Sequence, residues 1–327
     1  MLRIAVDGMG GDGAPGEIVQ GAAEAADALG VDVTVVGQPA QVQSLLEPYP
    51  KLHLHPATEV VAMDEHPARA VRSKPDSSMS VCARLCKEGG ADAWVSAGNS
   101  GGVLAAALLI QGRIKGVERP ALGTVLPGPN GPSYLVDVGA NVDCKPEYLL
   151  QFAIMGAVFA RHVLRREPPR VGLLANGEEA SKGNQLVRDV YERLRGGDEG
   201  YDFVGNIEPK DLLRGHADVV VADGFAGNLV VKTAEATAEM LLGILRQEIP
   251  RSARGKVGGL LIRPSIGRIR GSIDWREYGG APLLGIDGTA VVAHGRSDAR
   301  AMRSAIKVAA ETAQAGLTER IREALAL

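Results

Sequence analysis

The chain has 327 residues, which is enough for one large α/β domain or two closely packed lobes. Hydrophobic residues make up 45% and charged residues 23%, as in ordinary globular proteins, whereas the 42 glycines lie well above the usual ~7%. The formal net charge of -3 argues against a nucleic-acid partner, and the longest apolar runs are about half of the ~20 residues needed to cross a bilayer. Asp7 interrupts the first apolar run before a secretion signal could be completed, so we expect a cytoplasmic protein.

Short β-branched runs alternate along the chain with longer alanine-rich segments of helical periodicity. The expected strands and the helices that follow them are 2–6 with 17–29, 93–96 with 101–111, 170–174 with 181–194, and 218–222 with 226–249, and 31–36 is a further strand. This alternation is typical of βαβ units and predicts a mostly parallel sheet with helices on both faces, a three-layer α/β/α fold. Two strand-like runs between 122 and 137 flank a turn-rich segment, 127–132, which predicts an inserted hairpin and hence a mixed sheet. No repeat or long linker divides the chain, so we expect one catalytic domain over 1–327.

A glycine-rich loop, residues 7–15, follows the first expected strand and leads into a helix. Unpaired amides at Gly10 and Gly11, next to a helix N-terminus, could hold an anion, with Asp7 and Asp12 beside them. The loop matches neither of the common nucleotide-binding glycine motifs, so no nucleotide is expected. A simple strand-to-helix turn is the alternative.

The second loop, residues 96–102, again joins an expected strand to an expected helix. It offers Asn99, Ser100, Gly101 and Gly102 for phosphate or substrate binding. It also spells G-x-S-x-G, the nucleophile elbow of α/β-hydrolases, and Asp287 followed by His294 completes the chain order Ser, acid, His. A serine hydrolase that uses Ser100 therefore stays an alternative, although no HGGG-type oxyanion motif precedes the loop, and a structural turn stays another.

Two later loops follow the same formula of strand, polar loop and helix. The segment 176–184 contains Glu178 and places Lys182 near the start of the next helix, at the strand end where open α/β sheets bind ligands. The segment 223–228 contains Asp223 and Asn228. Asn228 could donate to a carbonyl or phosphate oxygen, or could simply cap the helix.

The segment 240–272 carries a basic, apolar stretch. Between 248 and 270 its cations are Arg251, Arg254, Lys256, Arg263, Arg268 and Arg270, opposed only by Glu248 and interleaved with aliphatic residues. We expect a protrusion that contacts anionic lipid or an acidic protein partner, with an ordinary solvated helix as the alternative. The histidines and cysteines show no convincing metal-ligand spacing, so no metal and no cofactor are expected.

Taken together and in this order, these loops resemble the PlsX-type phosphate acyltransferases, which convert fatty acyl-(acyl carrier protein) and inorganic phosphate into acyl phosphate. The resemblance spans nearly the whole chain and also rests on the segments 72–79, 118–122, 137–143 with Asn141, and 279–285. It implies a fold similar to isocitrate and isopropylmalate dehydrogenases, a homodimer, peripheral membrane association and a place in phospholipid synthesis. It also implies substrate-contacting roles for Lys182 and Asn228. Ser100 stands where the family more often has Thr, and Gly8 where Ala is usual.

Inorganic phosphate is itself a nucleophile, so a Ser-His-Asp device is unnecessary. Our hypothesis is that backbone amides and two side chains hold phosphate while it attacks the thioester, namely Gly10, Gly11, Gly101 and Gly102 with Ser100 and Lys182. Asn228 or Lys182 would then stabilise the carbonyl oxyanion. A non-catalytic membrane scaffold on the same fold is the remaining alternative.

Overall fold

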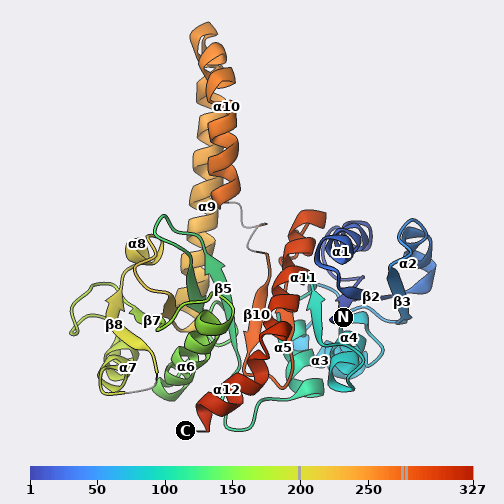
Figure 1. Cartoon of the computed structure of the whole chain (residues 1–327), viewed down its shortest axis with the longest axis horizontal. Helices are drawn as coiled ribbons and strands as arrows, with labels where there is room; N and C mark the ends of the chain where they lie inside the picture. Colours follow the sequence, from blue (N-terminus) through green and yellow to red (C-terminus); the bar gives the residue numbers. More distant parts are fainter. Residues whose placement is uncertain (198–199, 274–275, 277–278, 327) are drawn as a thin grey trace.

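The computed structural model describes residues 1–197, 200–273, 276 and 279–326, with the side chains of 269–273 outside that description (Figure 1). Eleven strands form one sheet in the order β3-β2-β1-β4-β11-β10-β5-β6-β9-β7-β8. The strands are β1 Arg3–Asp7, β2 Asp32–Gly37, β3 Leu52–Pro56, β4 Ala93–Ser96, β5 Ala121–Leu126, β6 Ser133–Val136, β7 Arg170–Leu174, β8 Asp202–Ile207, β9 Val219–Val221, β10 Ala281–Leu284 and β11 Ala290–Val292. The α-helices are α1 Gly16–Leu29, α2 Pro39–Leu46, α3 Pro67–Ser73, α4 Ser78–Lys87, α5 Ser100–Ala106, α6 Pro146–His162, α7 Gln185–Arg195, α8 Pro209–Leu212, α9 Gly224–Glu248, α10 Ala253–Ile273, α11 Ala299–Gln314 and α12 Leu317–Leu325.

The sheet is mixed, as the turn-rich segment predicted. β5 and β6 form the expected antiparallel hairpin, and β10 lies antiparallel between β11 and β5, whereas the other described neighbours are parallel. The antiparallel pairs reverse the strand direction between the two halves of the sheet. We call β3-β2-β1-β4-β11 the first half and β6-β9-β7-β8 the second half.

This reversal corrects one expectation about the site. The loops after β1 and β4 leave the carboxyl ends of first-half strands, but the loops after β7 and β9 follow strands of opposite direction. The four glycine-rich and polar loops therefore do not share one edge of the sheet. α9, which begins after β9, contacts the first half through Lys232 and Glu239, as described below.

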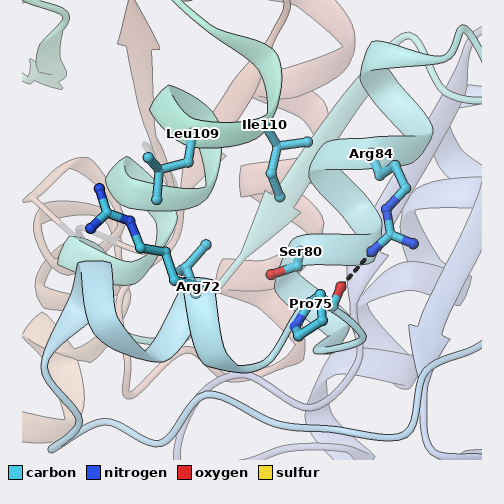
Figure 2. A pocket seen from close by; sticks show the side chains of 7 residues that line it. Arg72, Pro75, Ser80, Arg84, Leu109 and Ile110 are labelled. Atoms are coloured by element: carbon cyan, nitrogen blue, oxygen red, sulfur yellow. Dashed lines mark hydrogen bonds between the residues drawn. The ribbon is translucent and has the colours of Figure 1, made fainter.

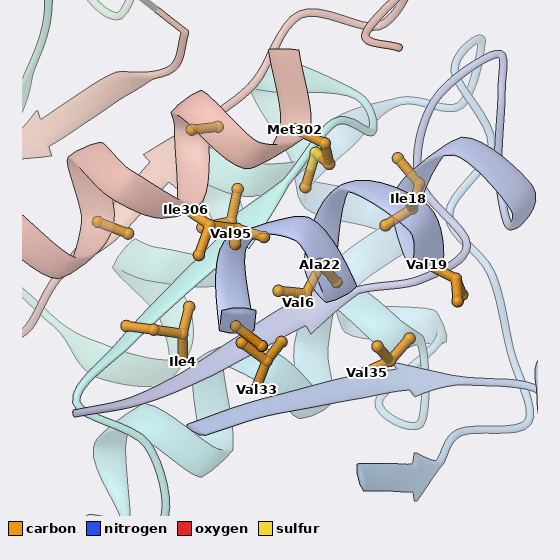
Figure 3. Close-up of a cluster of buried hydrophobic side chains, with 14 of the residues drawn as sticks. Ile4, Val6, Ile18, Val19, Ala22, Val33, Val35, Val95, Met302 and Ile306 are labelled. Atoms are coloured by element: carbon orange, nitrogen blue, oxygen red, sulfur yellow. The ribbon is translucent and has the colours of Figure 1, made fainter. Parts of the chain in front are cut away.

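Helices cover both faces of both halves. Figure 3 shows Ile18 of α1 and Met302 and Ile306 of α11 above Val6 and Val95 of the sheet, and these side chains belong to one buried cluster. α4 and α5 cover the opposite face of the first half around the fully buried Trp94. In the second half, α6, α7 and α12 cover one face, and α8 with the first turns of α9 covers the other. The predicted three-layer α/β/α class is confirmed.

Three predicted helices differ from the structure at one end, each for a local reason. The helix predicted over 101–111 is α5 followed by a π-helical turn, Ala107–Gln111, which ends where the Gly112 amide bonds to Ala107 O. The helix predicted from 181 begins at Gln185, because Gly183 has a φ of +94° and the Asn184 side chain caps the helix. The helix predicted from 226 begins two residues earlier, because the Asp223 side chain is its N-cap.

The predicted protrusion is a helical hairpin made of the outer part of α9, a short 3₁₀ turn at Ile249–Arg251, and α10. Figure 1 shows both helices extending far beyond the sheet and its covering helices. Gly255 and Gly259 of α10 lie against Ile249, where larger residues would clash. Arg251, Arg254, Lys256, Arg263 and Arg268 are exposed, while the Arg270 side chain lies outside the described residues. Within the described chain, no helix is both long and apolar enough to span a membrane.

Candidate active site

Three loops at the carboxyl ends of first-half strands contact one another. Gly10 lies so close to Gly98 that a β-carbon on Gly10 would come within 2.7 Å of the Gly98 nitrogen. Gly11 has a φ of +100°, a conformation that favours glycine, and the Asp12 amide donates to Gly295 O at 2.7 Å. The loops after β1, β4 and β11 thus form one compact surface in which small residues are required.

The buried Asp7 side chain holds these loops in place through hydrogen bonds. Its carboxylate is buried and accepts from Ser96 Oγ at 2.6 Å and from the Met9 amide at 3.1 Å, while Ser96 Oγ in turn accepts from the Gly98 amide. Burial raises the pKa of Asp7, and the surrounding donors counteract part of that rise. Asp7 was expected among the phosphate-binding residues, but in the structure it supports the loops from inside the core.

At the start of α5, some predicted residues of the second loop bond to the protein itself, and others remain available to a ligand. Asn99 is the N-cap: its Oδ1 accepts from the Gly102 amide at 3.0 Å, and its Nδ2 donates to Met63 O at 3.0 Å and Glu65 O at 3.1 Å. The Gly102 amide is therefore already bonded and does not offer the expected phosphate contact. Ser100 is exposed and, among the described residues, its hydroxyl forms no hydrogen bond. The Gly101 amide lies in the first turn of α5, where amides have no partner within the helix.

In the second half, Asp137 organises the loop after β6. Its buried carboxylate accepts from the amides of Leu122, Gly139, Ala140 and Asn141 and from the Asn141 side chain. Burial raises the pKa of Asp137 above its usual value, and these donors offset only part of the rise. The Asn141 side chain also donates to Pro120 O at 2.7 Å, so the predicted substrate residue Asn141 has its amide group engaged within the fold.

This loop fixes Asn228 near the start of α9. Asn228 Nδ2 donates to Val138 O at 2.9 Å, and the Gly224 amide donates to Asn141 O at 2.7 Å. The helix cap is Asp223, whose Oδ1 accepts from the Ala226 amide at 2.8 Å, so capping does not explain Asn228. One Nδ2 hydrogen of Asn228 has a fixed partner, which orients the amide group and leaves the second hydrogen for a ligand.

Lys182 lies in the exposed loop between β7 and α7. Within the described part of the chain its ammonium group has no hydrogen bond or ion pair, and its stem lies over Gly177. Glu178, in contrast, is paired with Lys210 at 3.3 Å. Glu178 also belongs to a cluster with Glu208 and Asp211, but Lys210 forms ion pairs with all three carboxylates and supplies the positive charge there.

α9 joins the two halves through contacts between residues far apart in the sequence. Lys232 Nζ lies 3.3 Å from His294 Nε2, and Arg296 Nη2 donates to Glu239 Oε1 at 2.7 Å. Lys232 is four residues after Asn228, on the same face of α9, and His294 follows β11. Burial, followed by the nearby Lys232 charge, lowers the pKa of His294. His294 was not among the predicted site residues, although its place just after a strand was a usable signal.

A separate depression lies between α3, α4 and the π-helical turn, away from the glycine-rich loops. It has a volume of about 490 Å³ and is lined by Val71, Arg72, Pro75, Ser80, Arg84, Leu109 and Ile110. Figure 2 shows Leu109 and Ile110 on one side and the Arg84 guanidinium bonded to Pro75 O on the other. Part of the segment 72–79 thus forms its wall.

Comparisons with known proteins agree over nearly the full chain. The family model described as "Fatty acid synthesis protein" matches residues 2–320. The phosphate acyltransferase of Desulfitobacterium hafniense (strain DSM 10664 / DCB-2) is 47% identical, covering 99% of this chain and 98% of that protein. The phosphate acyltransferase of Dictyoglomus turgidum is 45% identical with the same coverage.

Solved structures share the fold at low sequence identity. A phosphotransacetylase from Streptococcus pyogenes superposes with a TM-score of 0.64 at 18% identity, covering 96% of this chain and 94% of that one. A branched-chain phosphotransacylase from Enterococcus faecalis V583 gives 0.62 at 13% identity, covering 96% and 99%. A 4-hydroxythreonine-4-phosphate dehydrogenase from Klebsiella pneumoniae gives 0.55 at 15% identity, covering 96% and 98%.

Proposed function

The chain belongs to the phosphate acyltransferase family, and from that membership we propose that it makes acyl phosphate from inorganic phosphate and fatty acyl-(acyl carrier protein), for phospholipid synthesis. The observation that supports the proposal is the close contact of the glycine-rich loops after β1, β4 and β11 beside the exposed Ser100 hydroxyl at the start of α5. Such a surface suits a compact anion better than a long nucleotide.

In the proposed reaction, a phosphate oxygen attacks the thioester carbonyl. The new C–O bond forms, the C–S bond breaks, and the hydrogen phosphate dianion transfers its proton to the departing thiolate, giving acyl phosphate and the free thiol of the carrier. Ser100 and the Gly11 and Gly101 amides hold the phosphate and reduce its charge repulsion with the carbonyl, whereas the Gly10 amide is used within the fold by the Asp7 carboxylate. Holding both substrates in one orientation supplies much of the acceleration.

Negative charge then develops on the carbonyl oxygen. We assign its stabilisation to Asn228, whose amide group is oriented by Val138 O, and to the ammonium of Lys182, which has no ion pair among the residues that the structure describes. Donors that are fixed before the reaction stabilise such an oxyanion without the cost of reorganising. Asp137 and Asn141 support Asn228 and Asp7 supports the glycine loops, without contact to the reacting atoms.

The serine hydrolase alternative lacks support from the geometry. A nucleophile elbow needs a histidine that accepts the serine proton, but the two ring nitrogens of His294 face Lys232 Nζ and the Arg296 amide. We therefore assign Ser100 as a hydrogen-bond donor to phosphate. Substitution of Ser100 by Thr, which keeps the hydroxyl, should retain phosphate-dependent activity, whereas loss of all activity would favour a dedicated nucleophile.

The hairpin of α9 and α10 carries the proposed peripheral contacts. Near its end Val257, Leu260 and Leu261 are 63%, 69% and 76% exposed, beside the exposed Arg254 and Lys256. Apolar side chains ringed by cations favour an anionic lipid surface. On α9, Leu241 and Ile244 are about half exposed, and we propose that a second copy of the chain covers them in a homodimer.

The test is to incubate the protein with acyl carrier thioester and ³²P-labelled phosphate and to separate labelled acyl phosphate. Labelled product that requires both substrates is expected. A protein that binds vesicles but forms no labelled product would be a scaffold, and the proposal would then be wrong.

A further inference from the structure

The depression between α3, α4 and the π-helical turn combines apolar surface with positive charge on either side. Figure 2 shows Leu109 and Ile110 between the side chains of Arg72 and Arg84. Leu109 is 46% exposed, which is high for a leucine on a covering helix of the sheet. The hollow has a volume of about 490 Å³, so it has room for a protruding apolar side chain of a partner.

The positive charge of this surface is not neutralised by ion pairs. Arg72 and Arg84 form none in the part of the chain that the structure describes, and neither do two cations beside them, Arg69 and Lys87. Arg69 lies one turn before Arg72 on α3, and Lys87 of α4 donates to the Ile110 carbonyl oxygen. Four cations thus surround one apolar hollow.

The carboxylates near these cations are fewer and are bonded to the backbone or lie at the edge. Asp76 accepts from the Thr58 amide at 2.9 Å, and Glu59 accepts from the Asp76 amide at 3.1 Å. The hydrogen bonds from Thr58, and to a smaller extent the charge of Arg84, lower the pKa of Asp76. Glu88 is exposed at the end of α4. The cations remain in excess, so the surface attracts an acidic partner.

The depression is connected to the proposed phosphate surface along two helices. Pro67, at the start of α3, lies so close to Gly101 that a β-carbon on Gly101 would come within 2.6 Å of Pro67 Cγ. Ser100 begins α5, and Leu109 lies in the π-helical turn that continues it. At ~1.5 Å per residue, about 13 Å separates Ser100 from Leu109 along the helix axis. A partner seated on the depression must therefore deliver its reacting group through an extended arm.

We propose that this depression is the docking site of the acyl carrier protein. Carboxylates of the carrier pair with Arg72 and Arg84, and an apolar side chain of the carrier enters between them against Leu109. The inference rests on the proposed function and deepens it, because it states where the acyl donor is held. A carrier presents its thioester at the end of a flexible prosthetic arm, so its folded part contacts the enzyme at a distance from the reacting carbonyl.

An anionic membrane is the other partner that a basic, apolar surface could meet, and two observations favour a protein. The apolar side chains here line a hollow, whereas insertion into lipid needs side chains that project, as Leu260 and Leu261 do near the end of the hairpin. Figure 1 shows α3 and α4 on the side of the molecule away from that end. A hairpin in contact with a membrane therefore leaves the depression free for a carrier.

The experiment compares two acyl donors that share the reacting thioester, namely the acyl carrier thioester and an acyl-pantetheine thioester that lacks the carrier protein. Arg72→Glu should raise KM for the carrier thioester about 10-fold at low salt, because the reversed charge repels an acidic face. The increase should shrink as added salt screens the charges. KM for phosphate and KM for acyl-pantetheine should stay within about twofold, because their contacts are intact. Adding Arg69→Glu should enlarge the effect.

Arg303→Glu is the matched control. Arg303 is an exposed arginine of α11, on the opposite face of the first half, and it likewise has no ion pair among the described residues. Leu109→Ser tests the apolar contact and should raise KM for the carrier thioester about 3- to 10-fold with little dependence on salt. If Arg72→Glu does not fold, Arg72→Gln keeps the test open, with an expected rise of about threefold.

Three results would overturn the inference. A KM for the carrier thioester equal to that of the Arg303→Glu control would remove the docking contact. An equal rise in KM for acyl-pantetheine would mean that Arg72 acts on the thioester or on the fold. Weakened sedimentation with anionic liposomes, together with an unchanged KM for the carrier thioester, would assign the surface to lipid.

Direct binding separates this inference from the proposed function. A fluorescently labelled carrier that has its prosthetic arm but no acyl group should bind the wild-type protein, and should bind Arg72→Glu more weakly than Arg303→Glu, even if no acyl phosphate is formed. Equal binding to both variants contradicts the docking site and leaves the proposed function intact. The proposed function fails separately, when the wild-type protein forms no labelled acyl phosphate.

Discussion

Replacing Asp137 by Asn tests the claim that a buried carboxylate positions Asn228. Oδ1 accepts from the Leu122, Gly139 and Ala140 amides at 3.0–3.1 Å, and Oδ2 accepts from the Asn141 amide at 2.7 Å and Asn141 Nδ2 at 2.9 Å. An asparagine has one oxygen, so the better orientation keeps the first set and turns an NH₂ group toward the Asn141 donors. Two charge-assisted bonds at about 1.5–3 kcal/mol each are lost, partly offset by removal of a buried charge, so we expect about 2–4 kcal/mol of destabilisation.

The same substitution should also reduce turnover. The loop ordered by Asp137 provides Val138 O, the partner of Asn228 Nδ2, so a disordered loop releases the proposed oxyanion donor. Loss of one such donor costs roughly 10²–10³-fold in kcat. Urea unfolding followed by circular dichroism and the labelled-phosphate assay measure the two effects. Asp143→Asn, an exposed carboxylate on the same loop, is the control. Stability and kcat equal to those of the control would refute the positioning role.

Three further outcomes follow from the site and the hairpin. Lys182→Ala should lower kcat by roughly 10²-fold or more while the circular dichroism spectrum stays unchanged, and full phosphate-dependent activity would remove Lys182 from the mechanism. Because the pKa of His294 is lowered, its neutral form stabilises the fold above its ordinary pKa of about 6.5, and this stability is lost as the pH falls toward the lowered value. His294→Gln should therefore unfold with a shallower pH dependence between pH 7 and pH 5, and an unchanged slope would contradict this. Charge reversal at Arg254 and Lys256 should weaken salt-sensitive sedimentation with anionic liposomes and leave kcat unchanged, whereas unchanged sedimentation would contradict the lipid contact.

The layers of the fold were predictable because they follow from local pattern. Alternating β-branched and alanine-rich segments gave the strands and helices, and the dense turn at 127–132 gave the hairpin between β5 and β6. Local pattern did not predict that the loops after β1 and β4 and the loops after β7 and β9 follow strands of opposite direction. This reversal depends on three antiparallel pairs in a row, and β10 makes two of them, with β11 and with β5. In the second pair Leu284 lies opposite Ala121, a partner far away in the chain that only the folded sheet sets.

The candidate site was predictable at the level of loops and less so at the level of side chains. Lys182, Ser100 and Asn228 lie where a ligand can reach them, at or near strand ends as the pattern indicated. Asp7 and Asn99 proved to bond to the protein itself, because short polar side chains at strand ends and helix starts also satisfy backbone donors.

The pair of Lys232 and His294 could not be found from spacing, since its members are 62 residues apart and meet only when α9 contacts the first half of the sheet. A helix places residues four apart on one face, so Lys232 could have been chosen once Asn228 was. Its partner required the structure.

The most direct test of phosphate as the attacking group is the release of carrier thiol, measured with and without phosphate in the same enzyme preparation. Thiol release that requires phosphate, with one acyl phosphate formed for each thiol released, is the expected result. Thiol release without phosphate, accompanied by free fatty acid or by acylated Ser100 in the intact protein mass, would contradict it.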